Sequence, residues 1–487
     1  MSRASAVLLL FAVTGCKPEE PPPWIDDTRI DGGSDLNDPE SSGTRMCAHE
    51  SSVYVLWVDD RVASGRRDLW LNRSGDLGQT WLEAPARINR GDGLVDSPEL
   101  TCSADGVFVV WSDDRDGTLG RGNIYFSHSI DGTEFPEEDR LISGDEEGFT
   151  EELSPRISLF GDRVAVTWSS DSYGSYDIFV SVSDDLGQSW QIPQRIEADQ
   201  PGSGWSGRPQ VALGERDEVW VTWEDTRNNE GDIYFAYSDT GGRNFTNGEA
   251  RLDLGDDVGA SDSFAPQLCT DNREDLLVVW QDLRNGDAET GEGTDILFNT
   301  SSDGGRTWLD EAVRLDSGTP GAFDSEKPRC YSRGYGTFDV VWSDGRNSAM
   351  DIYHRTIQDG IPGEEEERID TGTGAGSSNA LDPQLAWGPN GPVVAWRGDQ
   401  LALEIDPDSL NSDLYYNYVD ASGGFLESEL RIDAWPDGLT EREDLNIAVI
   451  GGTMHVAWTD SRNVNKDIYV RTLSLGDEAV PPPATTR

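Results

Sequence analysis

The chain has 487 residues, with 92 Asp and Glu against 38 Lys and Arg, so its formal net charge is -54. A field of this sign disfavours nucleic acid and anionic membrane surfaces as partners, and it suits cations such as Ca²⁺ or a salty medium. The 17 Trp, 13 Tyr and 14 Phe residues, together with recurring apolar runs, indicate a folded chain in spite of the charge.

The first 16 residues, MSRASAVLLLFAVTGC, have the composition of an export signal. A basic start at Arg3 precedes an apolar stretch that is too short to span a bilayer. Residues 13–16 resemble a bacterial lipobox, which implies a signal peptide over residues 1–15 and a lipid-modified Cys16 at the mature N-terminus. An ordinary signal peptide with a chance cysteine is the alternative.

The next segment, residues 16–23, is Pro-rich and is predicted to be a stiff tether. No later stretch contains 18 consecutive apolar residues, so the lipid on Cys16 would be the membrane anchor. Lys17 rather than Asp follows the cysteine, and by the resemblance to bacterial lipoproteins this favours the outer membrane or cell surface over the inner membrane. The sequence therefore predicts an exported bacterial lipoprotein.

Eight short apolar runs that end in Trp recur along the rest of the chain. These tryptophans, 54 to 62 residues apart, are Trp57, Trp111, Trp168, Trp223, Trp280, Trp342, Trp396 and Trp458. Short Val-rich runs predict strands that are buried on both faces. The interval fits four strands with their loops, which is the repeat length of a propeller blade.

Each repeat has the same four parts. A short strand opened by Pro comes first and the Trp strand second. The third strand begins Asp-Ile-Tyr or a variant, and the fourth carries a basic-apolar pair such as Arg87-Ile88. The eighth repeat lacks a fourth strand, whereas residues 28–31, Thr-Arg-Ile-Asp, precede the first repeat and match the fourth-strand sequence at 367–370.

An N-terminal strand that completes the last blade would close the ring and remove both exposed sheet edges. The prediction is an all-β fold, a single eight-bladed β-propeller of four-stranded blades over residues 24–476, whose ring is closed by the N-terminal strand. Residues 477–487 are predicted to be a disordered tail.

Three turns share the pattern Ser-x-Asp-x-Gly-x-(Thr/Ser)-Trp. They are carried by Ser74, Asp76, Gly78 and Trp81, by Ser183, Asp185, Gly187 and Trp190, and by Ser301, Asp303, Gly305 and Trp308. This pattern resembles the Asp box, or BNR repeat, of the sialidase superfamily. The resemblance implies a β-propeller in which the box joins strands three and four, so we expect a structural role for these residues. Sialidases have six blades, so this chain departs from them in blade number.

On the opposite face, six repeats present a Trp-x-Asp-x-Arg motif. Its arginines are ligand-binding candidates: Arg61, Arg115, Arg227, Arg284, Arg346 and Arg462. The sialidase resemblance implies an arginine triad that holds a sugar carboxylate, a group suited to bidentate Arg. Six equal Asp and Arg pairs also fit ion pairs that tie loops together, and this alternative stays open. Because the RIP motif is absent and no Tyr and Glu pair can be assigned, no catalytic residue is assigned.

The loops on that face carry aromatic and oxygen-rich segments. Trp205 and Trp435 are further ligand-binding candidates, by stacking on a sugar ring or filling a partner's pocket. Loops 89–97 and 253–263 are rich in Asp, Gly and Ser, so Ca²⁺ is an open alternative without an assigned ligand set, and no metal site or cofactor is predicted.

The predicted function is binding of a glycan or protein partner by an envelope-anchored propeller. The protein is predicted to bind no nucleic acid and to be a monomer. The alternative is an exo-acting glycoside hydrolase of the sialidase type, and a further alternative is a structural component of an envelope assembly.

Four cysteines lie on first strands, in two pairs of adjacent repeats. Four cysteines allow three pairings, and neighbouring innermost strands favour Cys47 with Cys102 and Cys269 with Cys330. Export permits oxidation, and free thiols are the alternative.

Overall fold

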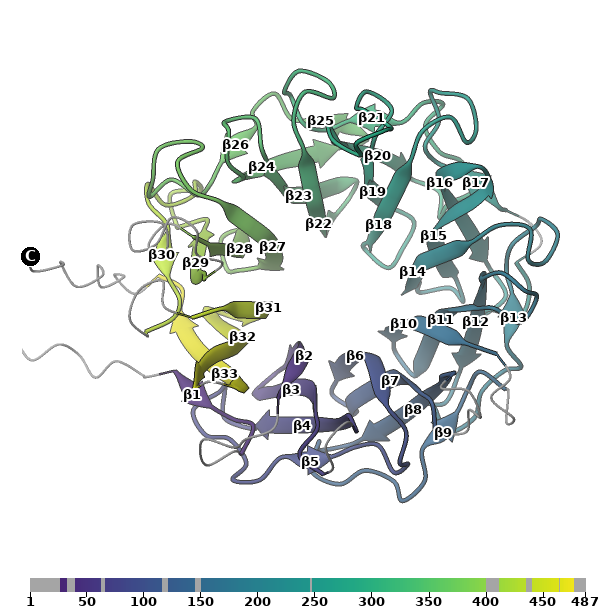
Figure 1. The fold of residues 1–487 in the computed structure, drawn as a ribbon, viewed down its shortest axis with the longest axis vertical. Helices are drawn as coiled ribbons and strands as arrows, with labels where there is room; N and C mark the ends of the chain where they lie inside the picture. Colours follow the sequence, from purple (N-terminus) through teal and green to yellow (C-terminus); the bar gives the residue numbers. More distant parts are fainter. Residues whose placement is uncertain are drawn as a thin grey trace, which may run out of the picture.

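The computed structural model describes residues 27–32, 40–62, 66–115, 121–144, 150–245, 248–399, 411–434, 440–463 and 465–476. Within these ranges every regular element is a β-strand, and antiparallel sheets form eight blades around one axis. Figure 1 looks down this axis. The predicted eight-bladed β-propeller is confirmed. The predicted signal peptide, Cys16, the tether, Trp435 and the tail lie outside the described residues.

The strands of each blade follow one another in the chain. Blade 1 holds β2 (Ser42–His49), β3 (Ser52–Asp59), β4 (Asp68–Ser74) and β5 (Ala86–Arg87). Blade 2 holds β6 (Val95–Ser103), β7 (Gly106–Asp113), β8 (Asn123–Ser129) and β9 (Arg140–Leu141). Blade 3 holds β10 (Glu152–Phe160), β11 (Arg163–Ser170), β12 (Asp177–Ser183) and β13 (Gln194–Arg195). Blade 4 holds β14 (Ser206–Leu213), β15 (Val219–Asn228), β16 (Glu230–Ser238) and β17 (Ala250–Arg251).

The second half of the ring repeats this order. Blade 5 holds β18 (Ser263–Thr270), β19 (Leu276–Asp282), β20 (Asp295–Ser301) and β21 (Val313–Arg314). Blade 6 holds β22 (Ser325–Gly334), β23 (Thr337–Asp344), β24 (Asp351–Gln358) and β26 (Glu367–Arg368), with β25 (Ile361–Pro362) added at the end of β24. Blade 7 holds β27 (Ala380–Trp387), β28 (Pro392–Gly398), β29 (Asp413–Tyr418) and β30 (Leu430–Arg431). Blade 8 holds β31 (Arg442–Ile450), β32 (Thr453–Asn463), β33 (Asn465–Ser474) and β1 (Thr28–Arg29).

The hydrophobic core lies between the blades, along the second strands. All eight repeated tryptophans are buried, with 0 or 1% of each residue exposed. Each blade is covered on both faces by its neighbours, so a second strand can be apolar on both sides. Among the described residues, no helix is long and apolar enough to cross a membrane.

The ring is closed by the N-terminal strand. Thr28 pairs with Val470 and Arg29 with Tyr469 across β1 and β33, which lie side by side in Figure 1. The next residue, Ile30, is 3% exposed and packs in the blade 8 to blade 1 core. This closure agrees with the predicted match of residues 28–31 to the fourth strand of another repeat.

The prediction that Pro usually opens the first strand of a blade is wrong in detail. Pro98 is the fourth residue of β6, beside a register shift, and Pro155, Pro209, Pro266, Pro328 and Pro383 occupy the corresponding places. The preceding residue has a positive φ in each case, for example 48° at Ser97. At a β-bulge the extra residue makes no ladder hydrogen bond, so the missing N–H of Pro costs nothing there.

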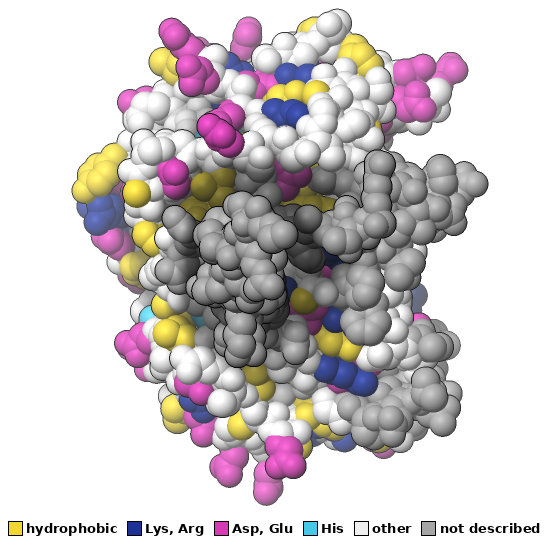
Figure 2. All heavy atoms as spheres, turned by 90° about the vertical axis from the view of Figure 1, so that its left-hand side faces the viewer, with side chains coloured by type: hydrophobic (Ala, Val, Ile, Leu, Met, Phe, Trp, Pro, Cys, Tyr) yellow, Lys and Arg dark blue, Asp and Glu magenta, His cyan; other side chains and the backbone are white. Residues whose placement is uncertain are grey.

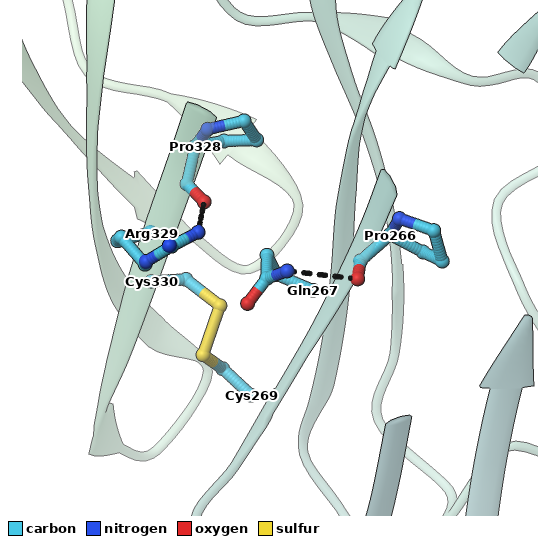
Figure 3. The surroundings of a disulfide bond; sticks show 6 residues. All are labelled: Pro266, Gln267, Cys269, Pro328, Arg329 and Cys330. Atoms are coloured by element: carbon cyan, nitrogen blue, oxygen red, sulfur yellow. Dashed lines mark hydrogen bonds between the residues drawn. A yellow bond between two sulfur atoms is a disulfide. The ribbon is translucent and has the colours of Figure 1, made fainter. Parts of the chain in front are cut away.

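Two disulfides join innermost strands of neighbouring blades. Cys47 is bonded to Cys102 between β2 and β6, and Cys269 to Cys330 between β18 and β22, both with Cα atoms 6.0 Å apart. Strands β2 and β6 lie on the opposite side of the ring from β18 and β22 in Figure 1, and Figure 3 shows the second bond. Neighbouring first strands belong to different sheets, so these bonds add a covalent link where no ladder runs.

Candidate binding site on the ring axis

The three Asp boxes close the turn between strands three and four. Asp76 accepts hydrogen bonds from the backbone N–H of Thr80 at 2.8 Å and from its hydroxyl at 2.6 Å. The Ser74 hydroxyl donates to Asp76 and accepts from the Gly78 N–H. The hydrogen bonds from Thr80 lower the pKa of Asp76 to about 2. The box is satisfied by its own residues, as expected for a structural turn; the face it occupies is called the Asp-box face below.

The Asp-box tryptophans also join neighbouring blades. Trp190 meets Phe126 of the preceding blade edge-on, with ring centroids 5.0 Å apart, and Trp308 meets Phe235 in the same way at 4.8 Å. Edge-to-face contacts of this kind are favourable beyond the area they bury. These boxes therefore contribute to the packing between neighbouring blades.

The Trp-x-Asp-x-Arg motifs lie on the opposite face, here called the loop face. In blade 4, Asp225 accepts hydrogen bonds from Trp223 Nε1 at 3.0 Å, from the backbone N–H of Arg227 at 2.8 Å and from its guanidinium at 2.5 Å. Arg227 also pairs with Glu249 at 2.8 Å and lies 4.2 Å from the centroid of Tyr234.

The other five motif arginines repeat this arrangement. Arg61, Arg115, Arg284, Arg346 and Arg462 each pair with the Asp two residues earlier. The six side chains are 5 to 20% exposed, and some also contact the loop that leads in from the preceding blade, as Arg284 does by donating to the carbonyl oxygens of Asp253 and Leu254. They do not converge on one site, and the geometry favours the ion-pair alternative over direct ligand binding.

A second cluster of charged side chains recurs in the blades, between the third and the fourth strand. Arg251 on β17 pairs with Asp232 at 3.1 Å, with Asp253 at 3.0 Å and with Asp256 at 2.7 Å. Burial, together with the charge of Asp232, raises the pKa of Asp253 to about 6, although Arg251 acts against this rise. In blade 6, burial and the charge of Asp351 raise the pKa of the equivalent Asp370 to about 8.

One such cluster has the spacing of a metal site. Ligand oxygens of Asp177, Glu197 and Asp199 lie within 4.8 Å of one another. Arg195 pairs with all three carboxylates, at 2.7 Å for Asp177 and 2.8 Å for Glu197. The guanidinium of Arg195 is therefore the cation that these three carboxylates share. No other group of possible metal ligands with this spacing occurs in the part of the chain that the structure describes. The alternative of a Ca²⁺ site therefore still has no ligands that can be assigned among the described residues.

Blade 7 lacks the motif, because Gly398 stands in place of its Asp. Arg442, the first residue of β31, fills the space with a fully buried side chain. It pairs with Asp413 and Asp433 at 3.0 Å and with Asp460 at 3.3 Å. The role of Arg442 escaped the sequence argument because the residue belongs to the next repeat.

The innermost strands place a ring of polar residues near the loop face. The bulge in each first strand contains one residue with a positive φ. The residues two positions after it are Arg45, Glu99, Arg156, Gln210, Gln267, Arg329, Gln384 and Asn446. We call these eight residues the axial ring. Contacts between blades link several of them, since Arg45 Nε lies 3.0 Å from Glu99 Oε1 and Arg156 Nη1 lies 3.2 Å from the same oxygen.

Arg329 differs from the other ring arginines in its partners. Its Nη1 donates to the carbonyl oxygen of Pro328 at 3.2 Å, as Figure 3 shows, and no described carboxylate forms an ion pair with it. Burial lowers the pKa of Arg329, and the charges of Arg156 and Arg45 lower it further, although Asp382 and Glu99 act in the opposite direction. Arginines of blades 1, 3 and 6 therefore act on one another across the axis.

Two more basic residues stand at the bulges themselves. Arg208 and Lys327 each have side chains that are 54% exposed, and they lie near Glu224 at 2.7 Å and Asp382 at 3.9 Å, respectively. Lys327 is one of only three lysines in the chain. In contrast, many acidic side chains project from the outer wall that Figure 2 shows. The equivalent bulge positions of blades 7 and 8 hold Asp382 and Asp444, so the inner wall near the loop face carries charges of both signs.

Two further features of the loop face bear on function. Trp205, immediately before β14, is 37% exposed, and Trp435 lies outside the described residues. In blade 3, the Tyr176 hydroxyl donates to Glu151 at 2.6 Å. Burial raises the pKa of Tyr176 and the bond to Glu151 raises it further, so this phenol keeps its proton. The charges that act most strongly on Tyr176 are those of Glu151, Asp171 and Arg121, and none of these is an axial arginine.

Comparisons with known proteins place the fold. A scan against protein-family models and a search of curated proteins found no match. Among solved structures, a polysaccharide lyase named as an ulvan lyase is similar with a TM-score of 0.46 at 10% identity, covering 76% of this chain and 91% of that one. A Hadza microbial sialidase is similar with a TM-score of 0.37 at 14% identity, covering 71% and 73%.

An α-L-arabinofuranosidase of Fusarium graminearum in complex with arabinobiose has a TM-score of 0.39 at 14% identity, covering 66% of this chain and 93% of that one. The β-propeller expected from the sequence is present in the structure itself, with eight blades. All three TM-scores lie below 0.5, so the similarity assigns no activity to this chain.

Proposed function

We propose that this protein is a glycan-binding propeller that holds an acidic saccharide, through a carboxylate or sulfate group, at the loop-face end of the ring axis. The observation that carries the proposal is Arg329 on the innermost strand of blade 6, which forms no ion pair with a described carboxylate, although the charges of Asp382, Arg156 and Arg45 all act on it. Oxyanions bind Arg by charge-assisted, bidentate hydrogen bonds, which are stronger than neutral ones.

The rest of the axial ring suits a saccharide better than a simple anion. Gln210, Gln267, Gln384 and Asn446 supply amide groups that can donate to and accept from sugar hydroxyls. Trp205 lies at the same face and can stack on a sugar ring. Small-ligand sites combine aromatic side chains with a few polar groups in defined positions, and the axial ring with Trp205 at its edge has this composition.

The net charge of -54 sets the salt dependence of this binding. At long range the protein repels an anion, and salt screens this repulsion beyond about 8 Å at physiological ionic strength. The contacts to the arginines are short and less screened. We therefore expect the association rate of an acidic glycan to rise between low and physiological salt. For partners of opposite charge the association rate falls as salt is added.

Binding can be tested with the purified protein on a glycan array and by calorimetry. Sialyllactose, glucuronate oligosaccharides and sulfated oligosaccharides are compared with neutral glycans. Replacing Arg329 by Gln should weaken binding at least about tenfold, which is about 1.4 kcal/mol. Arg306 is a matched control, because it is 42% exposed on the Asp-box face and Arg306→Gln makes the same charge change. Equal losses in both variants, or no preference for acidic glycans, would refute the axial site.

The exo-acting hydrolase is the second candidate, favoured by the Tyr176 and Glu151 hydrogen bond. We expect binding without turnover, because Tyr176 keeps its proton and the motif arginines are ion-paired. A sialidase assay across linkages decides. Hydrolysis that is lost in Tyr176→Phe would replace the binding proposal with the hydrolase, and absence of any glycan ligand would favour a structural role in an envelope assembly.

The anchor is proposed from the sequence alone. A lipid on Cys16 would hold the propeller at the outer membrane or cell surface through the tether of residues 16–23. Metabolic labelling with a fatty acid in a bacterial host should label the wild type and leave Cys16→Ser unlabelled. Labelling that persists in Cys16→Ser would rule the anchor out.

A further inference from the structure

The space between blades 6 and 7 on the Asp-box face departs from the repeat. At two other places in the ring an Asp-box Trp meets a Phe of the preceding blade, since Trp190 meets Phe126 and Trp308 meets Phe235. Here Phe425 takes the place of the Trp and His354 the place of the Phe, with ring centroids 5.2 Å apart and planes at 69°. The packing geometry is kept, but a smaller ring and a polar ring replace the two larger apolar ones.

A buried acid accompanies this change. Asp339, three residues before the repeated Trp of blade 6, is fully buried. The equivalent residues of the other blades are Tyr54, Phe108, Ala165, Trp220, Leu277, Val393 and His455, so an acid at this place is peculiar to blade 6. A buried ion pair contributes less to stability than well-packed apolar side chains of similar volume, so packing does not account for Asp339.

Asp339 orients the histidine. Its carboxylate accepts hydrogen bonds from Arg333 Nε at 2.5 Å and from Thr356 Oγ1 at 3.2 Å, and lies 2.8 Å from His354 Nε2. Burial acts to raise the pKa of Asp339, but hydrogen bonds from His354 and Arg333 hold it below its ordinary value. The carboxylate is therefore ionised and accepts a hydrogen bond from His354 Nε2, whereas His354 Nδ1 has no hydrogen-bond partner among the described residues.

Arg333, His354 and Thr356, the three partners of Asp339, border a hollow of about 270 Å³. Its lining includes Arg333, His354, Glu367, Trp387, Asn390 and Phe425. Trp387 is held between Tyr331, stacked at 5.2 Å, and Arg333, whose guanidinium carbon lies 5.0 Å from the ring centroid. The wall is thus fixed before any ligand arrives, and its volume is near the lower end of small-ligand sites, which begin at about 300 Å³.

We propose that this hollow is a second binding site, which takes one ring of a neutral saccharide. Apolar rings at Trp387 and Phe425 suit the C–H faces of a sugar, while His354 Nδ1, the Glu367 carboxylate and the Asn390 amide suit its hydroxyls. Arg333 and Asp339 neutralise each other, so Glu367 leaves the site negative and unfavourable to an acidic sugar. The site differs from the axial ring in face and in charge preference.

The test follows the His354 imidazole resonances of the whole protein by NMR during titration into the millimolar range. The probes are glucose, galactose, mannose and N-acetylglucosamine, with glucuronate as the acidic counterpart of glucose. We expect a saturable shift with at least one neutral sugar and binding of glucuronate that is at least about tenfold weaker than that of glucose. No saturable shift with any neutral sugar, or glucuronate binding as tight as glucose, would overturn the proposal.

Two variants restore the residues of the other blades and should keep the fold. Phe425→Trp should fill the hollow and His354→Phe should remove the acceptor, and each should weaken sugar binding at least about tenfold by calorimetry. Arg329→Gln, at the axial ring, is the matched control and should leave neutral-sugar binding unchanged, which separates this site from the proposed acidic one. Undiminished binding in both restoring variants would place the sugar elsewhere and refute the assignment.

Discussion

Closure of the ring by the N-terminal strand can be measured at Ile30. Ile30 is 3% exposed, packs with Val55, Trp57 and Ile468, and its N–H donates to Ile468 O at 3.0 Å. Ile88 holds the same place in blade 1, where it is fully buried and its N–H donates to Leu69 O at 2.8 Å. The two residues form a matched pair, because one lies at the closure and the other within a continuous blade.

Truncating a buried Ile to Ala removes transfer free energy and leaves a cavity, at a cost of about 2–5 kcal/mol. We expect Ile30→Ala and Ile88→Ala to lower the free energy of unfolding by similar amounts in that range. Urea denaturation followed by tryptophan fluorescence gives both values, since the repeated tryptophans adjoin both sites. A change within about 0.5 kcal/mol for Ile30→Ala, beside a full loss for Ile88→Ala, would show that the N-terminal strand does not complete the last blade.

Three further predictions concern bonds and charges that the fold repeats. Removing the disulfide with Cys269→Ser and Cys330→Ser should lower the free energy of unfolding by about 4 kcal/mol for a 61-residue separation, and equal urea midpoints with and without the bond would contradict this. Arg442→Met removes the fully buried cation that Asp413, Asp433 and Asp460 share, so that only Arg431 and Arg462 remain beside them, and it should destabilise by about 3–5 kcal/mol in the same assay, whereas a neutral effect would mean that the two remaining arginines are sufficient. Because the folded-state pKa of Asp370 is raised to about 8, its contribution to stability is fully present below the unfolded pKa near 3.8 and is lost as pH rises toward 8. Asp370→Asn should therefore flatten the fall of stability with pH by up to about 1.4 kcal/mol per pH unit within this window, as followed by melting temperature, and an unchanged slope would refute the shift.

The sequence by itself determined the features that depend on short-range contacts or on counting. The Asp box is one, because Ser74, Asp76, Gly78 and Thr80 satisfy one another within seven residues of chain. The blades are another, because a Val-rich run buried on both faces must be covered by neighbours, and eight such runs with one displaced fourth strand can close only one way.

Only the tertiary structure decided where charges from different repeats meet. Arg45, Arg156 and Arg329 lie in blades 1, 3 and 6, and nothing local in the sequence marks them, since their guanidinium groups approach one another only across the closed ring. The same holds for Arg442, which serves the cluster of the preceding blade, and for Asp339, His354 and Phe425, which belong to two blades. Repeat patterns fix what each blade does alone, whereas electrostatic and cavity-forming contacts depend on distances that ring closure sets.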